Sequence, residues 1–203
     1  MDHILGEVII IRALEQRILE EGQILPGEVL KVGSFLNQQI DTKLLKDMGD
    51  EIARLFGSNN VTKVLTIESS GIAIAFAAGL SMGLPVVFAK KHSTLNLTGN
   101  ILTSKVFSYT HQQTYDIAVS SDYITSEDTV LIVDDFLAKG NALTGLIEIV
   151  NQAGAKLAGC AIAIEKGFQG GGDSLRAKGI RVESMAIIDK MTDDSLEFRP
   201  QQT

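Results

Sequence analysis

The sequence predicts a single α/β domain built on a mainly parallel, twisted β-sheet with helices on both faces. Two observations point to this fold class: short apolar runs typical of buried strands recur along the 203 residues, and segments of helical periodicity separate them. Strands that alternate with helices of about 10–15 residues form βαβ units, whose parallel sheets are covered on both faces. With 45% hydrophobic residues and only 3 prolines, the chain can bury a sizeable core.

The first part of the chain is expected to hold two helices separated by irregular structure. Apolar residues between positions 14 and 19 recur at helical spacing, so a first helix should end near Gly22. The following stretch, residues 22–41, is punctuated by Gly and Pro, which favours irregular chain. A second helix is indicated by the apolar residues Leu44, Leu45, Met48, Ile52, Leu55 and Phe56. That helix should stop at Gly57.

The rest of the chain alternates between strand and helix patterns. Strands are expected at 63–67, 85–90, 130–133, 157–164 and 180–188, and helices at 71–83 and 141–153. Alternating residues within 105–120 predict a hairpin, whereas the polar residues 93–104 lack a clear period and should form a loop. The glycine-rich stretch 167–173 could flank a ligand but is equally consistent with a flexible connector.

Composition argues against several classes of protein. A formal net charge of −7 disfavours a general binder of nucleic acid or of membrane surfaces, because both attract basic patches. No apolar run approaches the ~20 residues of a membrane helix, and the N-terminus lacks signal-peptide features. The single Cys160 excludes an internal disulfide and should be a buried packing residue. Together with the missing signal peptide and membrane helix, the lone cysteine makes a cytoplasmic protein the simplest expectation. His3, His92 and His111 have no ligand spacing, so we expect no protein-held metal site.

The stretch "VLIVDDFLAKGNAL" (130–143) carries the strongest indication of function. Its apolar strand runs into two adjacent carboxylates, Asp134 and Asp135, which are costly to bury without a partner. Ligands of parallel sheets bind at the carboxyl ends of the strands, where both acids can turn toward hydroxyl groups or a hydrated metal ion. Residues 138–142 then lead into a helix whose first N–H groups suit a phosphate. The alternative is a surface turn with solvated acids.

Two further stretches end predicted strands at the same edge. In "IESSGIA" (67–73) a short polar loop precedes a helix, so a serine could simply cap that helix, or the loop could form a second anion cradle. In "FAKKHS" (88–93), Lys90 and Lys91 could be a solvated edge or could bind an anion. Together the three stretches describe a ligand with a phosphate at one end, a diol in the middle and a pyrophosphate at the other.

These residues resemble a known family. The stretch 130–142 is similar to the ribosyl-diphosphate signature of the type I phosphoribosyltransferases, in which a hydrophobic strand, two acids and a phosphate loop follow one another. The resemblance extends to the bacterial xanthine phosphoribosyltransferases, whose segments look like "LKVGSFLNQQID", "IESSGIA", "KKHSTLNLT", "DDFLAKGNA" and "IEKGFQ" in this order. It covers about residues 12–199, and residues 1–11, a candidate disordered extension, fall outside it.

The resemblance implies a fold and a reaction. The fold is that of the type I phosphoribosyltransferases, with a flexible loop and a small N-terminal hood to which about residues 22–42 contribute. The reaction transfers 5-phosphoribosyl from phosphoribosyl diphosphate to N9 of xanthine, and gives xanthosine 5'-monophosphate and diphosphate in purine salvage. It requires Mg²⁺, held mainly through the substrate. A homodimer is expected, in which Lys90 and Lys91 can reach across the interface.

The resemblance also implies roles for individual residues. The catalytic pair that faces the ribose hydroxyls is Asp134 and Asp135. The 5-phosphate is held by Ala138, Lys139, Gly140, Asn141 and Ala142. The pyrophosphate is bound by Glu68, Ser69, Ser70, Gly71, Lys90 and Lys91, and xanthine by Leu30, Asn37 and Lys166. Many members of the superfamily have threonine where Lys139 stands, so this phosphate loop lacks some of their hydroxyl donors.

Two alternatives stay open. Lys166 can donate to the purine 6-oxo oxygen, which guanine and hypoxanthine share with xanthine, and Asn37 can offer either a donor or an acceptor to the 2-position. Guanine or hypoxanthine could therefore be the preferred base. The other alternative is a regulator that senses phosphoribosyl diphosphate without catalysis, although the acidic chain has no basic DNA-binding segment. For an enzyme, the polar stretch 93–108 is expected to be a lid.

Overall fold

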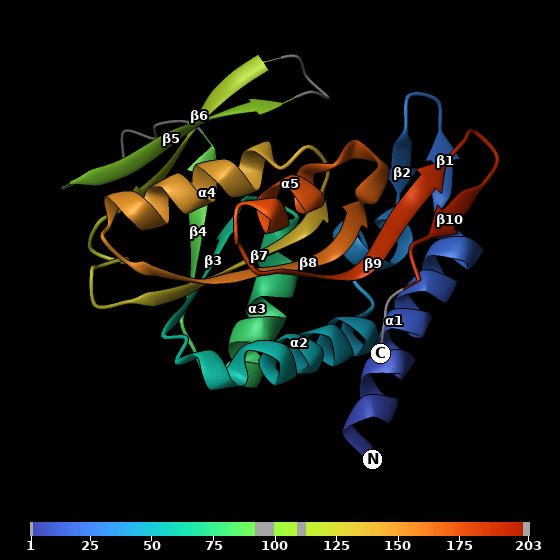
Figure 1. Ribbon diagram of the computed structural model, residues 1–203, viewed down its shortest axis with the longest axis horizontal. Coiled ribbons are helices and arrows are strands. Elements are labelled where there is room, and N and C mark those ends of the chain that lie inside the picture. The colour runs from blue at the N-terminus through green and yellow to red at the C-terminus, as the bar shows by residue number, and fades with distance from the viewer. Residues whose placement is uncertain (1, 92–99, 109–112, 201–203) are drawn as a thin grey trace.

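The computed structural model describes residues 2–91, 100–108 and 113–200, and an eight-stranded sheet forms its centre (Figure 1). Its strands are β3 (Lys63–Ile67), β4 (Val86–Lys91), β5 (Ile101–Ser108), β6 (Gln113–Ser120), β7 (Thr129–Leu137), β8 (Lys156–Lys166), β9 (Val182–Met191) and β10 (Leu196–Phe198). They lie in the order β10-β9-β8-β7-β3-β4-β6-β5. The strands from β9 to β4 are parallel, and β10, β6 and β5 pair antiparallel. The predicted mainly parallel sheet is confirmed.

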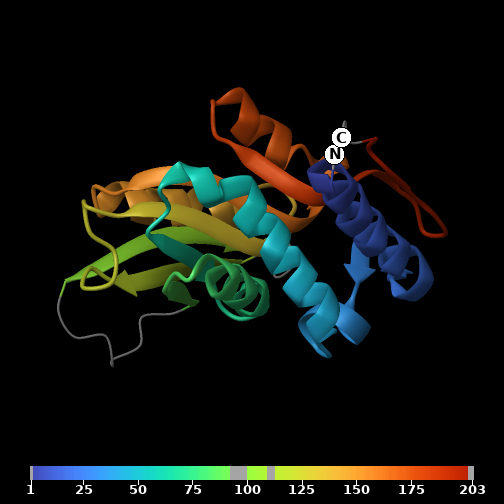
Figure 2. The same ribbon diagram turned by 90° about the horizontal axis from the view of Figure 1, so that it is seen from below.

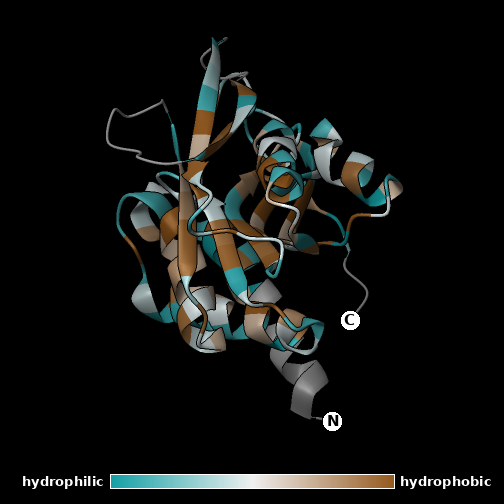
Figure 3. Ribbon diagram, turned by 90° about the vertical axis from the view of Figure 1, so that its left-hand side faces the viewer, coloured by the Kyte–Doolittle hydropathy of each residue, from teal (hydrophilic) through white to brown (hydrophobic). Residues whose placement is uncertain are grey.

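Helices cover both faces of this sheet (Figures 1 and 2). α2 (Thr42–Phe56) and α3 (Gly71–Met82) lie on one face, and α4 (Asn141–Gln152) and α5 (Gly171–Ala177) lie on the other. α1 (Asp2–Glu21) lies to the side, where it contacts β9 and α2 (Figure 1). Successive residues of β7 point to opposite faces, so Leu131 and Val133 pack with α2 and α3, whereas Val130 and Ile132 pack with α4. In Figure 3 the hydrophobic segments run through the strands at the centre of the molecule. The predicted helices at 71–83 and 141–153 match α3 and α4 closely.

The N-terminal segment forms a small lobe beside the ends of β8 and β9 (Figure 1). Residues 22–41, which we expected to be irregular, contain the antiparallel hairpin of β1 (Gln23–Leu25) and β2 (Val29–Lys31) and a π-helical turn at Gly33–Asn37. Strands of three residues are too short to show an alternating pattern, and this explains the wrong prediction. α1 begins at Asp2 and therefore includes most of residues 1–11.

Two other segments differ from the prediction. Residues 101–104 were expected in a loop, but they belong to β5, which pairs with β6 along its whole length. The strand pattern was hidden because its inward side holds a polar residue, Ser104, as well as Leu102 and Val106. Residues 167–173 are no loose connector, since they form a 3-10 turn and the start of α5. The expected lid at 93–108 is therefore partly strand, and its residues 93–99 lie outside the described residues.

The single cysteine, Cys160, is buried, as predicted. Cys160 lies in β8 within the core under α4, and burial raises the pKa of its thiol to about 12, so it stays protonated and packs as an apolar side chain. In the part of the chain that the structure describes, no helix is both long and apolar enough to cross a membrane.

Candidate active site

The acid pair lies within β7 rather than after it. We expected the strand to end at residue 133, but β8 continues to pair with it as far as Leu137. On its other side, β3 pairs with β7 only as far as Ile132. β7 therefore carries Asp134 and Asp135 beyond the β3 ladder, to the edge of the sheet at which α3 begins. Their exposed fractions are 4% and 7%, so neither acid is a solvated surface charge.

A glycine makes room for this pair. A Cβ on Gly71, the first residue of α3, would lie 2.6 Å from Asp134 Oδ1 and 2.3 Å from Thr66 Oγ1. No larger residue fits there. Thr66 is fully buried, and its hydroxyl has no hydrogen-bond partner among the described residues. The start of α3 thus packs directly against the acid pair, with an unpaired hydroxyl beside it.

The site concentrates negative charge. Burial raises the pKa of Asp134 well above its ordinary value, and the neighbouring Asp135 carboxylate raises it further. The Asp135 N–H, which donates to Asp134 Oδ1 at 3.0 Å, and the charge of Lys91 act in the opposite direction. Burial and the charge of Asp134 also raise the pKa of Tyr115. Such a field suits a ligand that offers hydroxyl donors, a cation or developing positive charge.

The loop of residues 138–142, called the phosphate loop below, follows β7 and starts α4. Gly140 has a φ of 85°, which turns the chain into the helix at Asn141, as predicted. Asn141 Nδ2 donates to the carbonyl of Phe107 at 2.9 Å and so ties the loop to β5. The helix N-terminus contributes about half a positive charge, and its first N–H groups can donate to a phosphate.

The second predicted cradle adjoins the basic pair. The loop Glu68–Gly71 links β3 to α3 and has a cis peptide bond between Glu68 and Ser69. The backbone N–H of Lys91 donates to Glu68 Oε1 at 2.5 Å, so the end of β4 is fastened to this loop. The Lys91 ammonium lies 5.5 Å from the ring centroid of Tyr115. The structure therefore brings the Glu68–Gly71 loop and Lys90–Lys91 together next to the acid pair.

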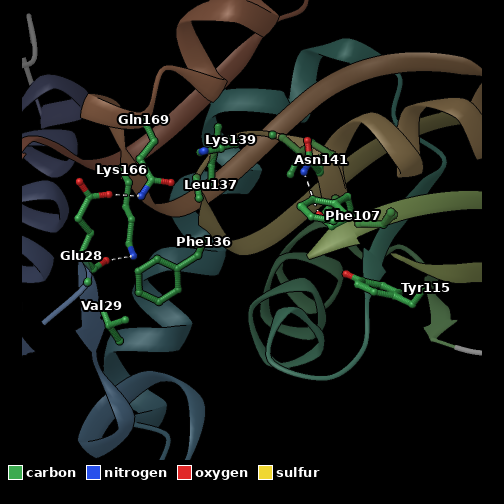
Figure 4. Close-up of a pocket in the computed structure, with 16 residues that line it drawn as sticks. Glu28, Val29, Phe107, Tyr115, Phe136, Leu137, Lys139, Asn141, Lys166 and Gln169 are labelled. Carbon is green, nitrogen blue, oxygen red and sulfur yellow. Dashed lines mark hydrogen bonds between the residues drawn. The ribbon is translucent and has the colours of Figure 1, made fainter. Parts of the chain in front are cut away.

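A cavity of about 550 Å³ extends from the phosphate loop toward the N-terminal lobe (Figure 4). Residues of three other regions also line it: Gly27, Glu28 and Val29 of the lobe, Phe107 and Tyr115 of the β5–β6 hairpin, and Phe136 and Lys166 from the ends of β7 and β8 with Gln169 of the turn after β8. The lining combines aromatic faces with a few polar groups, which is typical of a site for a planar polar molecule.

Lys166 lies at the lobe side of this cavity. Its ammonium donates to the backbone carbonyl of Glu28 at 2.6 Å and lies 5.8 Å from the ring centroid of Phe136. Gln169 Nε2 donates to Glu28 Oε2 at 2.8 Å (Figure 4). Burial lowers the pKa of Lys166, and the Glu28 carboxylate acts in the opposite direction. These contacts hold the turn of the β1–β2 hairpin against the end of β8.

Leu30 and Asn37 lie elsewhere. Both line a second hollow, of about 760 Å³, within the N-terminal lobe, whereas Lys166 lines the first cavity. Leu30 is buried and Asn37 is exposed. The structure thus brings Leu30 and Asn37 together but does not place them around one cavity with Lys166.

Among the lining residues of the first cavity that sequence reasoning missed, three are grouped around Lys166: Phe136, Glu28 and Gln169. Phe136 directly follows the acid pair, beyond the predicted end of the strand at residue 133, and was given no role. Glu28 and Gln169 meet across 141 positions of the sequence, which no local pattern can indicate. One local signal for Glu28 existed, because the preceding Pro26-Gly27 favours a turn, and Glu28 does adopt a left-handed φ of 60°.

Carboxylate oxygens are the metal-ligand atoms that this site offers. Within the described ranges, no group of three or more His, Cys, Asp or Glu side chains could hold one. Asp134 and Asp135 are nevertheless hard oxygen donors, and Mg²⁺ is commonly held by one or two carboxylates together with substrate phosphates. The residues present therefore fit Mg²⁺ that arrives with a phosphorylated ligand, and they do not form a closed protein cage.

Comparison with known proteins identifies the family to which this chain belongs. The family model described as "Phosphoribosyl transferase domain" matches residues 35–191, which include the acid pair, the phosphate loop and Lys166. An adenine phosphoribosyltransferase from Giardia lamblia, solved with 9-deazaadenine, superposes with a TM-score of 0.73 over 86% of this chain and 96% of its own, at 22% identity, and shows the shared fold. The chain belongs to the phosphoribosyltransferase family.

Curated relatives within the family are much more similar. A xanthine phosphoribosyltransferase of Pseudomonas syringae is 52% identical over 187 residues, which are 92% of this chain and 99% of the relative. Another, from Oceanobacillus iheyensis, is 50% identical over 186 residues, which are 92% of this chain and 96% of the relative. The type I phosphoribosyltransferase fold and the family resemblance expected from the sequence are confirmed.

Proposed function

We propose that the protein is a purine salvage enzyme that transfers 5-phosphoribosyl from phosphoribosyl diphosphate to N9 of xanthine. The observation that carries this proposal is the buried acid pair in β7, together with the phosphate loop that joins β7 to the N-terminus of α4. A 550 Å³ cavity with a lysine at its far side adjoins that loop. Relatives at about half identity over nearly the whole chain are named for the same activity.

The proposed mechanism follows from the charges of the site. When the bond from ribose C1 to the pyrophosphate breaks, positive charge develops on the ribose ring. Asp134 and Asp135 are fixed in a water-poor environment and stabilise that charge without reorganising. The phosphate loop holds the 5-phosphate, while the Glu68–Gly71 loop and Lys90–Lys91 hold the leaving pyrophosphate. Mg²⁺, when bound with the substrate, supplies positive charge that offsets the charge of the phosphates.

The base is proposed to occupy the cavity between the phosphate loop and Lys166. The Lys166 ammonium has three donors, of which one is used by the Glu28 carbonyl, so others can reach a purine oxo oxygen. Phe136 offers an aromatic face beside the lysine. For Leu30 and Asn37 to contact the same base, the N-terminal lobe would have to move, because they line a different hollow.

The decisive experiment measures turnover by ultraviolet absorbance with phosphoribosyl diphosphate and Mg²⁺, and supplies xanthine, guanine, hypoxanthine and adenine separately. We expect xanthine to react fastest and adenine not to react. Faster reaction with guanine or hypoxanthine would replace the proposed substrate and keep the reaction. Binding of phosphoribosyl diphosphate without turnover of any base would favour a sensor over an enzyme.

The role of Asp135 is tested separately. We expect Asp135→Asn to lower kcat by about 10²–10³ and to leave the affinity for the base nearly unchanged, because the acid acts on developing charge. Equal losses in kcat and in base affinity would indicate a structural role.

A homodimer is part of the proposal, supported by an exposed apolar face. Phe76 and Leu80, one turn apart on α3, are 61% and 69% exposed, and Phe88 on β4 is 40% exposed. A second copy would cover this face next to Lys90 and Lys91. Sedimentation velocity should show a dimer for the native protein and a monomer for Leu80→Lys. A fully active native monomer would refute a cross-interface role of the basic pair. The cytoplasmic location stays a prediction.

A further inference from the structure

Gly171 contacts the phosphate loop more closely than any residue with a side chain could. A Cβ at this position would lie 2.2 Å from the Ala138 carbonyl oxygen, 2.6 Å from the Lys139 carbonyl carbon and 2.7 Å from the Gly140 nitrogen. All three are backbone atoms, so they cannot rotate away as a flexible side chain would. The first turn of α5 therefore packs backbone to backbone on the outer side of the phosphate loop.

α5 is itself fastened to the sheet by charged groups. Arg176 donates two hydrogen bonds to Glu165, a fully buried residue of β8, at 2.9 and 2.7 Å, and the Ser184 hydroxyl of β9 donates to the same carboxylate at 2.5 Å. Asp173 accepts two hydrogen bonds from Arg199, at 2.9 and 3.0 Å. Buried carboxylates held this way resist displacement, because breaking the pair leaves an uncompensated charge.

We propose that Gly171 is a positioning residue for the 5-phosphate of the substrate, because α5, held by the Glu165–Arg176 pair, fixes the conformation of the phosphate loop. The inference rests on the proposed function and adds a residue 29 or more positions from the loop to its binding site. A phosphate cradle made of backbone N–H groups needs a fixed backbone, since each donor must point at the same small anion. Here the neighbouring backbone of α5 supplies that rigidity.

The test compares Gly171→Ala with Gly57→Ala. Gly57 follows α2 with a φ of −59°, and a Cβ there would meet no atom within 4 Å, so this variant controls for the glycine substitution itself. We expect Gly171→Ala to raise KM for phosphoribosyl diphosphate by about tenfold or more, equivalent to about 1.4 kcal/mol or more, with KM for xanthine nearly unchanged. Calorimetric affinity for ribose 5-phosphate should fall by a similar factor. Gly57→Ala should change neither.

The outcomes separate this inference from the proposed function. An unchanged KM for phosphoribosyl diphosphate, or equal rises in both KM values, would overturn the positioning role. A native protein that binds ribose 5-phosphate but turns over no base would remove the proposed function and leave the calorimetric comparison valid. Should Gly171→Ala fail to fold, the double variant Arg176→Met with Glu165→Gln decides: it releases α5 without leaving a buried charge unpaired, and it should weaken ribose 5-phosphate binding by about threefold. No change in that variant would overturn the inference.

Discussion

Replacing Asp134 with asparagine should make the protein more stable and less active, and the gain in stability should depend on pH. Asp134 is 4% exposed, and burial together with the Asp135 charge raises its pKa above the ordinary 3.8. The Asp134 carboxyl thus binds a proton more tightly in the folded protein than in the unfolded chain. As pH rises from about 4, the native protein loses stability until the carboxyl is ionised in the folded state as well.

The expected pH dependence of stability follows from the single proton that Asp134 binds. The native protein should lose up to about 1.4 kcal/mol per pH unit within this window because of Asp134. Asparagine carries no charge at any pH, and its Oδ1 can still accept the Asp135 N–H that lies 3.0 Å away. The difference in unfolding free energy, variant minus native, should therefore rise with pH by up to that slope and then level off. Turnover should fall by about 10²–10³, because the transition state loses one carboxylate.

Urea unfolding of the native protein and Asp134→Asn at several pH values between 4.5 and 8 measures this difference. Asp128→Asn is a control of opposite sign. Burial alone would raise the pKa of Asp128, but hydrogen bonds from the Thr125 N–H, Lys63 and Thr62 hold it below its ordinary value. The ionised Asp128 carboxylate stabilises the folded protein fully above about pH 4. Over the measured pH range, Asp128→Asn should therefore be less stable than the native protein by a nearly constant amount. A difference for Asp134→Asn that is independent of pH, or that falls as pH rises, would refute the reasoning.

Three further changes follow from contacts of the site. Gln169→Leu removes the 2.8 Å hydrogen bond to Glu28 and should raise KM for xanthine about fivefold, with KM for phosphoribosyl diphosphate unchanged. Equal rises of the two KM values in steady-state assays would contradict this prediction. Arg176→Met leaves the buried Glu165 carboxylate without its partner and should lower the free energy of unfolding, measured in urea, by about 3–5 kcal/mol; adding Glu165→Gln should restore most of it. A double variant as unstable as Arg176→Met would argue against a paired charge. Lys166→Met should raise KM for xanthine at least about tenfold while ribose 5-phosphate still binds in calorimetry, and an unchanged KM would remove the lysine from the base site.

Much of this site was readable from the sequence because its parts are contiguous. The acid pair, the phosphate loop and the start of α4 lie within residues 134–142, so strand and helix patterns alone place them at one edge of a parallel sheet. The central elements α2, α3, α4 and β3 were predicted well for a related reason: each buries a continuous stripe or run of apolar residues, and that periodicity is a local property. Short or mixed elements, such as β1, β2 and α5, carry no such signal.

The burial of the acid pair was decided by tertiary structure. The sequence indicates two adjacent carboxylates, but it does not indicate that β7 extends to Leu137, or that α3 packs against the pair through Gly71. Burial comes from those neighbours, and burial is what raises the pKa of Asp134. The prediction that the strand ends before the acids was wrong, because pairing with β8 continues β7 to Leu137.

By itself, then, the sequence determined the fold class, the family and the segment proposed to bind the ribosyl phosphate, since apolar periodicity and a contiguous motif are encoded along the chain. Only the tertiary structure decided that Glu28 meets Lys166 and Gln169, and that Gly171 packs against the backbone of the phosphate loop. Each of those contacts joins residues 29 or more positions apart. Their geometry depends on how whole elements pack on the sheet, and packing is settled by the sum of many weak contacts rather than by any local pattern.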